Sequence, residues 1–138
     1  MILVATGPLV ALSDSRDPHH KRAIDELRST RRADLVVCEA VLVETCFHLP
    51  HPAQRRRLQA IIDEFDIRPV VIGDTHRFWL DVFEWLTKYA EHEPDWADAC
   101  IAVLSGYHDR LKVWAYDREF KTTWRRPDGS SIPLAIKL

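Results

Sequence analysis

The chain has 138 residues, 46% of them hydrophobic and 29% charged, and its formal net charge is −2. This balance predicts one ordinary globular domain over residues 1–138, and it argues against a disordered chain or a uniformly basic nucleic-acid coat. No apolar run approaches the roughly 18 residues that a membrane span needs, and the N-terminus lacks the pattern of a signal peptide. Three cysteines without metal-ligand or redox spacing indicate reduced thiols. We therefore expect a cytoplasmic protein with no membrane partner.

Strands and helices are predicted in alternation along the chain. The apolar run from Met1 leads into Thr6-Gly7-Pro8, which indicates a strand over residues 1–5 that ends at a turn. Asp17-Pro18 predicts the start of a helix that runs to about Arg28. The later predicted elements are a strand over 34–38, a helix over 41–49 ended by Pro50, a helix from Pro52 to about residue 65, a strand over 68–72, a helix over 75–90, a helix from Pro94 to about Tyr107, a strand over 111–115 and a short edge strand over 132–136.

This alternation predicts an α/β fold with three layers. Strands that are joined through helices form a parallel sheet, here of four to five strands, with helices on both of its faces. In such sheets the chemistry gathers at the carboxyl ends of the strands. The architecture by itself does not determine a function.

Acidic residues occur where such a sheet brings side chains toward one edge. Asp98 is flanked by alanines and leads an apolar helical run, so its carboxylate is expected to face the sheet end, and Asp95 lies three residues earlier on the same helix face. Asp117 follows a buried strand by two residues, and Glu44 lies in the middle of a helix. The ordinary alternatives are a helix-dipole role for Asp95, a turn role for Asp117 and a solvated helix face for Glu44.

Such a group of carboxylates favours a metal site. Carboxylates in one cleft repel each other, and a divalent cation removes that cost. Oxygen ligands with few imidazoles or thiolates favour Mg²⁺ or Mn²⁺ over zinc. These ions stabilise phosphoryl oxygens and help to ionise the attacking water in two-metal nucleases. Residue 5 ends the first strand at the same edge, but it is an alanine, so one carboxylate of a four-carboxylate site is missing.

Basic and aromatic residues indicate possible nucleic-acid contacts. Trp124 joins an aromatic ring to Arg125 and Arg126, and Arg118 follows Asp117, so these four residues are candidate RNA contacts. Taken singly, each arginine cluster is more typical of a solvated helix face. The clusters are Arg31-Arg32, Arg55-Arg56-Arg57 and Arg125-Arg126. The aromatic stripe of the helix over 75–90 is expected to pack in the core or against a partner protein.

Four segments together resemble one family. VATGPLVAL, VLVETCFHL, DWADACIAVLSG and AYDREF, in this order and spacing, resemble PIN-domain ribonucleases, and among these the VapC-like toxins of type II toxin–antitoxin systems. The likeness spans nearly the whole chain. Each short motif is weak alone, but the combination is fairly specific.

The resemblance implies a PIN-like fold and a metal-dependent endoribonuclease that hydrolyses RNA by attack of water. It assigns catalytic and metal-ligand roles to Glu44, Asp98 and Asp117, and Asp95 occupies a position that is often acidic in the family. Thr6 matches a hydroxyl residue that commonly follows the first aspartate. The resemblance also implies a homodimer and a cognate antitoxin whose C-terminal tail lies in the RNA groove.

The chain departs from the family pattern at Ala5, where that pattern has an aspartate. A methyl group cannot ligate a metal ion, so ion positioning and water activation should both suffer. Our leading interpretation is a deliberate Asp-to-Ala change, because an active toxin is hard to produce and the surrounding sequence is intact. A naturally degenerate homologue is the alternative.

Two other functions compete with the toxin interpretation. A binding module with the same fold would hold RNA or a protein without cutting, but a drifting site should lose more than one acid, and Glu44, Asp98 and Asp117 all remain. A phosphatase of the haloacid dehalogenase type would need a second aspartate two residues after the first, where this chain has Gly7.

Overall fold

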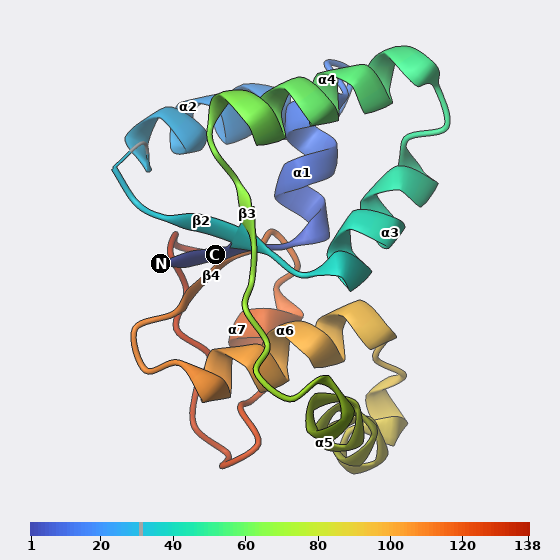
Figure 1. Ribbon diagram of the computed structural model, residues 1–138, viewed down its shortest axis with the longest axis vertical. Coiled ribbons are helices and arrows are strands. Elements are labelled where there is room, and N and C mark those ends of the chain that lie inside the picture. The colour runs from blue at the N-terminus through green and yellow to red at the C-terminus, as the bar shows by residue number, and fades with distance from the viewer. Residues whose placement is uncertain (31) are drawn as a thin grey trace.

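A computed structural model describes residues 1–30 and 32–138 and confirms the three-layer α/β/α architecture (Figure 1). The central sheet has four parallel strands in the order β3-β2-β1-β4. Their bounds are β1 Ile2–Val4, β2 Leu35–Val37, β3 Arg68–Pro69 and β4 Lys112–Trp114. β1 lies at the centre, where Leu3 pairs with Val36 on one side and Val113 on the other.

Helices cover both faces of the sheet (Figure 1). One layer holds α1 (Thr6–Ser13), α2 (His20–Ser29), α3 (Glu39–His48) and α4 (Pro52–Glu64), and the other holds α5 (Thr75–Lys88), η1 (Ala90–His92), α6 (Trp96–Tyr107) and α7 (Glu119–Thr122). Within the described residues no helix is long and apolar enough to span a membrane.

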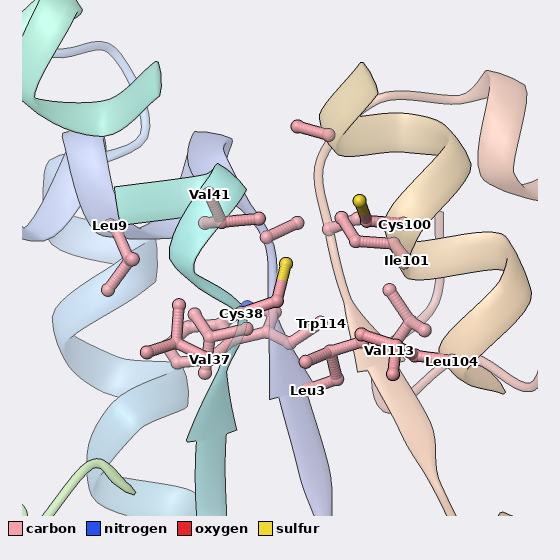
Figure 2. Close-up of a cluster of buried hydrophobic side chains, with 14 of the residues drawn as sticks. Leu3, Leu9, Val37, Cys38, Val41, Cys100, Ile101, Leu104, Val113 and Trp114 are labelled. Carbon is pink, nitrogen blue, oxygen red and sulfur yellow. The ribbon is translucent and has the colours of Figure 1, made fainter. Parts of the chain in front are cut away.

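The core lies between the sheet and these two layers. Leu3 and Val113 on the strands and Leu104 on α6 are fully buried. Figure 2 shows Cys38 and Val41 at the start of α3 facing the α6 residues across the strand ends. Because both faces of the sheet are covered, its two inner strands β1 and β2 are apolar and buried throughout, as parallel strands commonly are.

The predicted turn at Thr6-Gly7-Pro8 is wrong, because α1 begins directly at Thr6. Pro8 fits there because the first turn of a helix has no internal acceptors for its N–H groups, so a missing N–H costs nothing. A Cβ at Gly7 would lie 3.4 Å from the Cβ of Tyr116, an ordinary contact, so the start of α1 does not require a glycine. The carboxyl end of β1 is therefore also a helix start.

Three other predicted boundaries shift. Asp17-Pro18 lies in a turn before α2, where the Asp17 carboxylate accepts a hydrogen bond from the His19 backbone N–H at 2.8 Å. The third strand is confined to residues 68–69 because the chain leaves the sheet early. The predicted edge strand over 132–136 reduces to a single parallel bridge between Leu134 and Val113. Arg31, which belongs to the predicted Arg31-Arg32 cluster, lies outside the described residues.

Candidate active site

A cleft of about 420 Å³ opens at the carboxyl edge of the sheet, beside the ends of β1 and β4. It brings together all the acids that the sequence singled out, from three separate segments. Its wall is formed by Ala5, Thr6, Gly7, Val10, Glu44, His48, Asp95, Asp98, Ile101, Ala115, Tyr116, Asp117 and Phe120.

Ala5 is buried in the wall of this cleft, with 4% of its surface exposed. Its backbone N–H donates to the Trp114 carbonyl at 2.9 Å, which continues the pairing of β1 with β4. Ala5 is also the N-cap residue of α1, with extended φ and ψ of −89° and 176°. Aspartate is among the best N-cap residues and alanine among the poorest. The local helix start therefore favours an aspartate at position 5, independently of any metal.

Asp98 is the most perturbed acid of the cleft. Burial, followed by the nearby charges of Asp95, Asp117 and Glu44, raises the pKa of Asp98 to about 8. The prediction that Asp95 lies inside the helix is wrong, because it is the N-cap of α6 and its carboxylate accepts the Asp98 backbone N–H at 2.8 Å. Asp95 thus has a capping role, and its side chain still lines the cleft.

Glu44 enters the cleft from the middle of α3. Burial and the charge of Asp95 raise its pKa, while a hydrogen bond with the Thr6 hydroxyl and the neighbouring His48 act in the opposite direction. The His48 Nε2 lies 4.0 Å from a Glu44 carboxylate oxygen, one turn further along the same helix. Glu44 is 31% exposed, so it belongs to the cleft wall rather than to a fully solvated face.

Asp117 is exposed at the rim, where β4 gives way to α7. Its carboxylate accepts the Glu119 backbone N–H at 2.9 Å, so the turn role considered for it is present. One carboxylate oxygen is used in this bond, and the side chain also lines the cleft. Arg118, the next residue, is exposed and does not line the cleft.

The donor set has the chemistry of a hard divalent cation site but not its full geometry. The cleft offers carboxylates and a hydroxyl, which Mg²⁺ and Mn²⁺ prefer. Across residues 1–30 and 32–138, no three histidine, cysteine, aspartate or glutamate side chains stand close enough to hold one ion together. The residue at the end of β1, Ala5, supplies no oxygen to draw them together.

The prediction that Trp124 contacts RNA is wrong. Trp124 is completely buried, and its ring packs edge-on against Trp85 at 5.4 Å and against Tyr89 at 5.9 Å. Arg125 and Arg126 are partly buried beside it and do not line the cleft. The Arg125 guanidinium donates to the backbone carbonyls of Trp124 and Lys121 at 2.9 and 3.3 Å. An RNA role for Arg118, Arg125 and Arg126 stays a prediction.

Sequence reasoning missed the two remaining polar side chains of the cleft wall, Tyr116 and His48. Tyr116 has no motif of its own, and only the pairing of β4 with β1 places it opposite Gly7. His48 follows Glu44 by four residues, and this spacing indicates that both lie on one helix face.

A second hollow, which we call the apolar groove, adjoins the cleft. It has a volume of about 970 Å³ and runs between α3 and the start of α5 and α6. Phe47, Val43 and Trp79 line it with 80%, 67% and 53% of their surfaces exposed. Glu44, His48 and Asp95 line both hollows.

Comparison with known proteins agrees with this fold. The structure resembles the crystal structure of Mycobacterium tuberculosis VapC20, described as a sarcin-ricin loop cleaving toxin, with a TM-score of 0.70 and 22% sequence identity over 88% of this chain and 94% of that one. No curated protein sequence matches the chain. The family model of the PIN domain matches residues 2–124, which is most of the chain. The chain therefore belongs to the PIN domain family.

Proposed function

We propose that this chain is a metal-dependent endoribonuclease of the VapC-like toxin type whose first acidic ligand is replaced by Ala5. The observation that carries the proposal is the convergence of Glu44, Asp98 and Asp117 on one cleft, beside an N-cap position that favours aspartate. The pKa of Asp98, raised first by burial and then by the neighbouring carboxylates, is typical of a functional cleft.

The residues of the cleft have distinct expected roles. Glu44, Asp98 and Asp117 would hold Mg²⁺ or Mn²⁺, with Asp95 and Thr6 beside them. When bound, such an ion stabilises charge on a phosphoryl oxygen and lowers the pKa of a water molecule. The Thr6 hydroxyl would stabilise the Glu44 carboxylate, and the α6 N-cap at Asp95 fixes the backbone that carries Asp98. Arg118 is the nearest candidate for a phosphate contact outside the cleft.

The apolar groove supports a protein partner, and we propose a second copy of this chain. Exposed aromatic side chains contribute about 150–250 Å² each when buried. Phe47, Trp79 and Val43 are each more than half exposed and would form the apolar centre of an interface, with Val70 and Ile72 beside them. A face that carries these apolar side chains is typical of an interaction site.

We further propose a cognate antitoxin and a cytoplasmic location, as the family resemblance implies. The acidic cleft is complementary to a basic tail, and an arginine directed at the carboxylates would offset their repulsion. Such a tail would compete with RNA for the same cleft.

One observation favours a second candidate function, a non-catalytic PIN-like module that binds RNA or protein. Ala5 removes an oxygen ligand, and the described side chains form no three-ligand group. On this alternative the cleft holds a ligand without cutting it.

The change Ala5→Asp distinguishes the two functions. The restored chain should cleave RNA in the presence of Mg²⁺ at least about 100-fold faster than the Ala5 chain, since even partners one shell beyond a metal ligand commonly contribute 10- to 100-fold. Suitable substrates are candidate tRNAs and an rRNA fragment with the sarcin-ricin loop, the target named for the structurally similar VapC20. Ala5→Asn is the matched control, because it caps α1 but adds no carboxylate. Equal activity of the three chains on every RNA would support the binding module.

A further inference from the structure

Tyr116 connects the cleft to α2. It lies between Ala115 and Asp117 in the cleft wall, and its hydroxyl donates to a Glu26 carboxylate oxygen on α2 at 2.6 Å. Burial raises the pKa of Tyr116, so the phenol stays a hydrogen-bond donor at neutral pH. This hydrogen bond directs the Tyr116 side chain toward α2.

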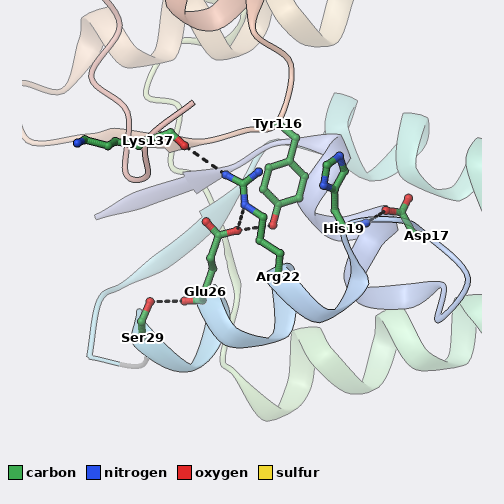
Figure 3. Close-up of polar contacts among 7 residues, drawn as sticks. All are labelled: Asp17, His19, Arg22, Glu26, Ser29, Tyr116 and Lys137. Carbon is green, nitrogen blue, oxygen red and sulfur yellow. Dashed lines mark hydrogen bonds and ion pairs between the residues drawn. The ribbon is translucent and has the colours of Figure 1, made fainter.

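The ring of Tyr116 is the middle layer of a stack. The guanidinium of Arg22 lies 4.7 Å from the ring centroid, and the imidazole of His19 lies 4.9 Å from it with a tilt of 41°. Figure 3 shows the Tyr116 ring between these two side chains. Arg22 is held in turn by Glu26 at 3.2 Å and by the Lys137 carbonyl at 3.2 Å. These two contacts hold the Arg22 guanidinium against the Tyr116 ring.

His19 is the open end of this stack. It is exposed, and its backbone is fixed by the Asp17 carboxylate. Lys21, exposed on α2, adds a cation close by in the sequence, while Arg16 is paired with Asp14 at 3.7 Å. An aromatic ring with an exposed face and a nearby cation is the combination by which proteins bind unpaired bases.

The acidic cleft gives such a site a clear use. Carboxylates without a metal ion repel phosphates, so contacts on the surrounding rim would add to the affinity for RNA. Trp124, the aromatic residue that the sequence favoured for this purpose, is buried. The stack on α2 supplies an aromatic surface that begins at the cleft wall with Tyr116.

We propose that an unpaired RNA base stacks on the exposed face of His19, as a fourth layer on the Arg22–Tyr116–His19 stack, with a neighbouring phosphate near Lys21. This inference rests on the proposed function, because it names where the substrate of the same site is gripped. The contact is independent of the metal ligands, so the Ala5 chain retains it.

Binding of RNA to the Ala5 chain tests the proposal without cleavage. The probe is a fluorophore-labelled single-stranded RNA of about 12 nucleotides, within the size range of single-strand sites, and its anisotropy gives the dissociation constant. His19→Ala should weaken binding about 5- to 150-fold, the range that loss of one base–aromatic stack produces. His19→Phe keeps a stacking ring and should bind within about twofold of the unchanged chain.

Two controls separate stacking from charge. His92→Ala removes another exposed histidine that touches an aromatic ring, Trp124, and should leave binding unchanged. An abasic RNA of equal length keeps the phosphates but should be insensitive to His19→Ala. Thermal unfolding checks that each variant is folded.

The proposal is overturned if the Ala5 chain binds no RNA, if His19→Ala binds as well as the unchanged chain, or if His19→Phe loses as much affinity as His19→Ala. Its failure is distinct from failure of the proposed nuclease. RNA binding through His19 with no cleavage after Ala5→Asp would refute only the nuclease, and cleavage with no effect of His19→Ala would refute only the stack.

Discussion

The cleft and the apolar groove both adjoin α3, but the cleft gathers carboxylates and the groove gathers apolar side chains. On α3, Glu44 faces a hollow of about 420 Å³ that gathers carboxylates, while Val43 and Phe47 face one of about 970 Å³ lined mainly by apolar side chains. The cleft carries charge that is costly to bury, as the raised pKa of Asp98 indicates. The groove carries apolar surface that is costly to expose, with Phe47 at 80%.

This difference means that catalysis and self-association can be tested separately, by substitutions at different residues. Changes of charge in the cleft should alter catalysis and pH dependence but leave association intact. Changes of apolar side chains in the groove should alter association. Glu44, His48 and Asp95 line both hollows, so they are poor probes of either one alone.

The largest expected effect comes from Asp98. In the Ala5→Asp chain, Asp98→Asn should lower Mg²⁺-dependent RNA cleavage at least about 100-fold, because it removes a metal ligand and its charge while keeping the size of the side chain. Asp63→Asn on the exposed face of α4 is the matched control and should cleave normally. If Asp98→Asn retained more than a tenth of the activity, Asp98 would not be a ligand.

The second largest effect is expected for self-association through the apolar groove. Phe47→Asp should weaken self-association by about 30-fold, the effect of losing one interface hot spot of roughly 2 kcal/mol, when measured by sedimentation at a series of concentrations. Leu80→Asp is the matched control. It changes an exposed apolar residue on α5 that does not line the groove, and the variant should self-associate normally. A chain that sediments as a monomer at all concentrations would contradict the homodimer.

The pH dependence of stability gives a smaller effect of known sign. The folded-state pKa of Asp98 is about 8 against an ordinary value of 3.8, so the folded chain holds this proton more tightly than the unfolded chain does. The stability that this group contributes is complete below about pH 4 and is lost as the pH rises toward 8. Above that range, the unfolding free energy of the Asp98→Asn variant should be larger than that of the unchanged chain. The difference should be on the order of 2 kcal/mol, after allowance for solvent screening.

Urea unfolding in EDTA at intervals from about pH 5 to 8.5 would measure this difference. The two unfolding free energies should converge toward the acidic end. Curves that stay parallel across the range would mean that Asp98 titrates normally, and the cleft would then not concentrate negative charge.

The smallest effect is expected at Arg118. If it contacts a phosphate beside the cleft, Arg118→Ala should weaken RNA binding several-fold and reduce the slope of log affinity against log salt by about 0.7, the value for one contact to a single strand. Arg56→Ala on the exposed face of α4 should leave the slope unchanged. An identical slope for Arg118→Ala would remove this residue from the RNA surface.

The sequence by itself determined the layers of the fold and the identity of the acids. Apolar runs and helical spacing depend only on neighbouring residues, so the strands around Leu3, Val36 and Val113 and the helix that carries Asp98 could be predicted. The alternation of strands and helices then placed the acids at one edge of the sheet, because parallel strands share a carboxyl edge.

Only the tertiary structure decided what each position does there. Residue 5 is an N-cap as well as a site position because α1 follows β1 without a turn. Trp124 is buried because α5 packs against the C-terminal segment, where the Trp85 indole donates to the Arg125 carbonyl at 2.8 Å. Tyr116 and His19 are distant in sequence and meet only because the residues that follow β4 reach α2, where the Tyr116 hydroxyl donates to Glu26. Burial and stacking depend on what packs across the core, and no local pattern in the chain records that.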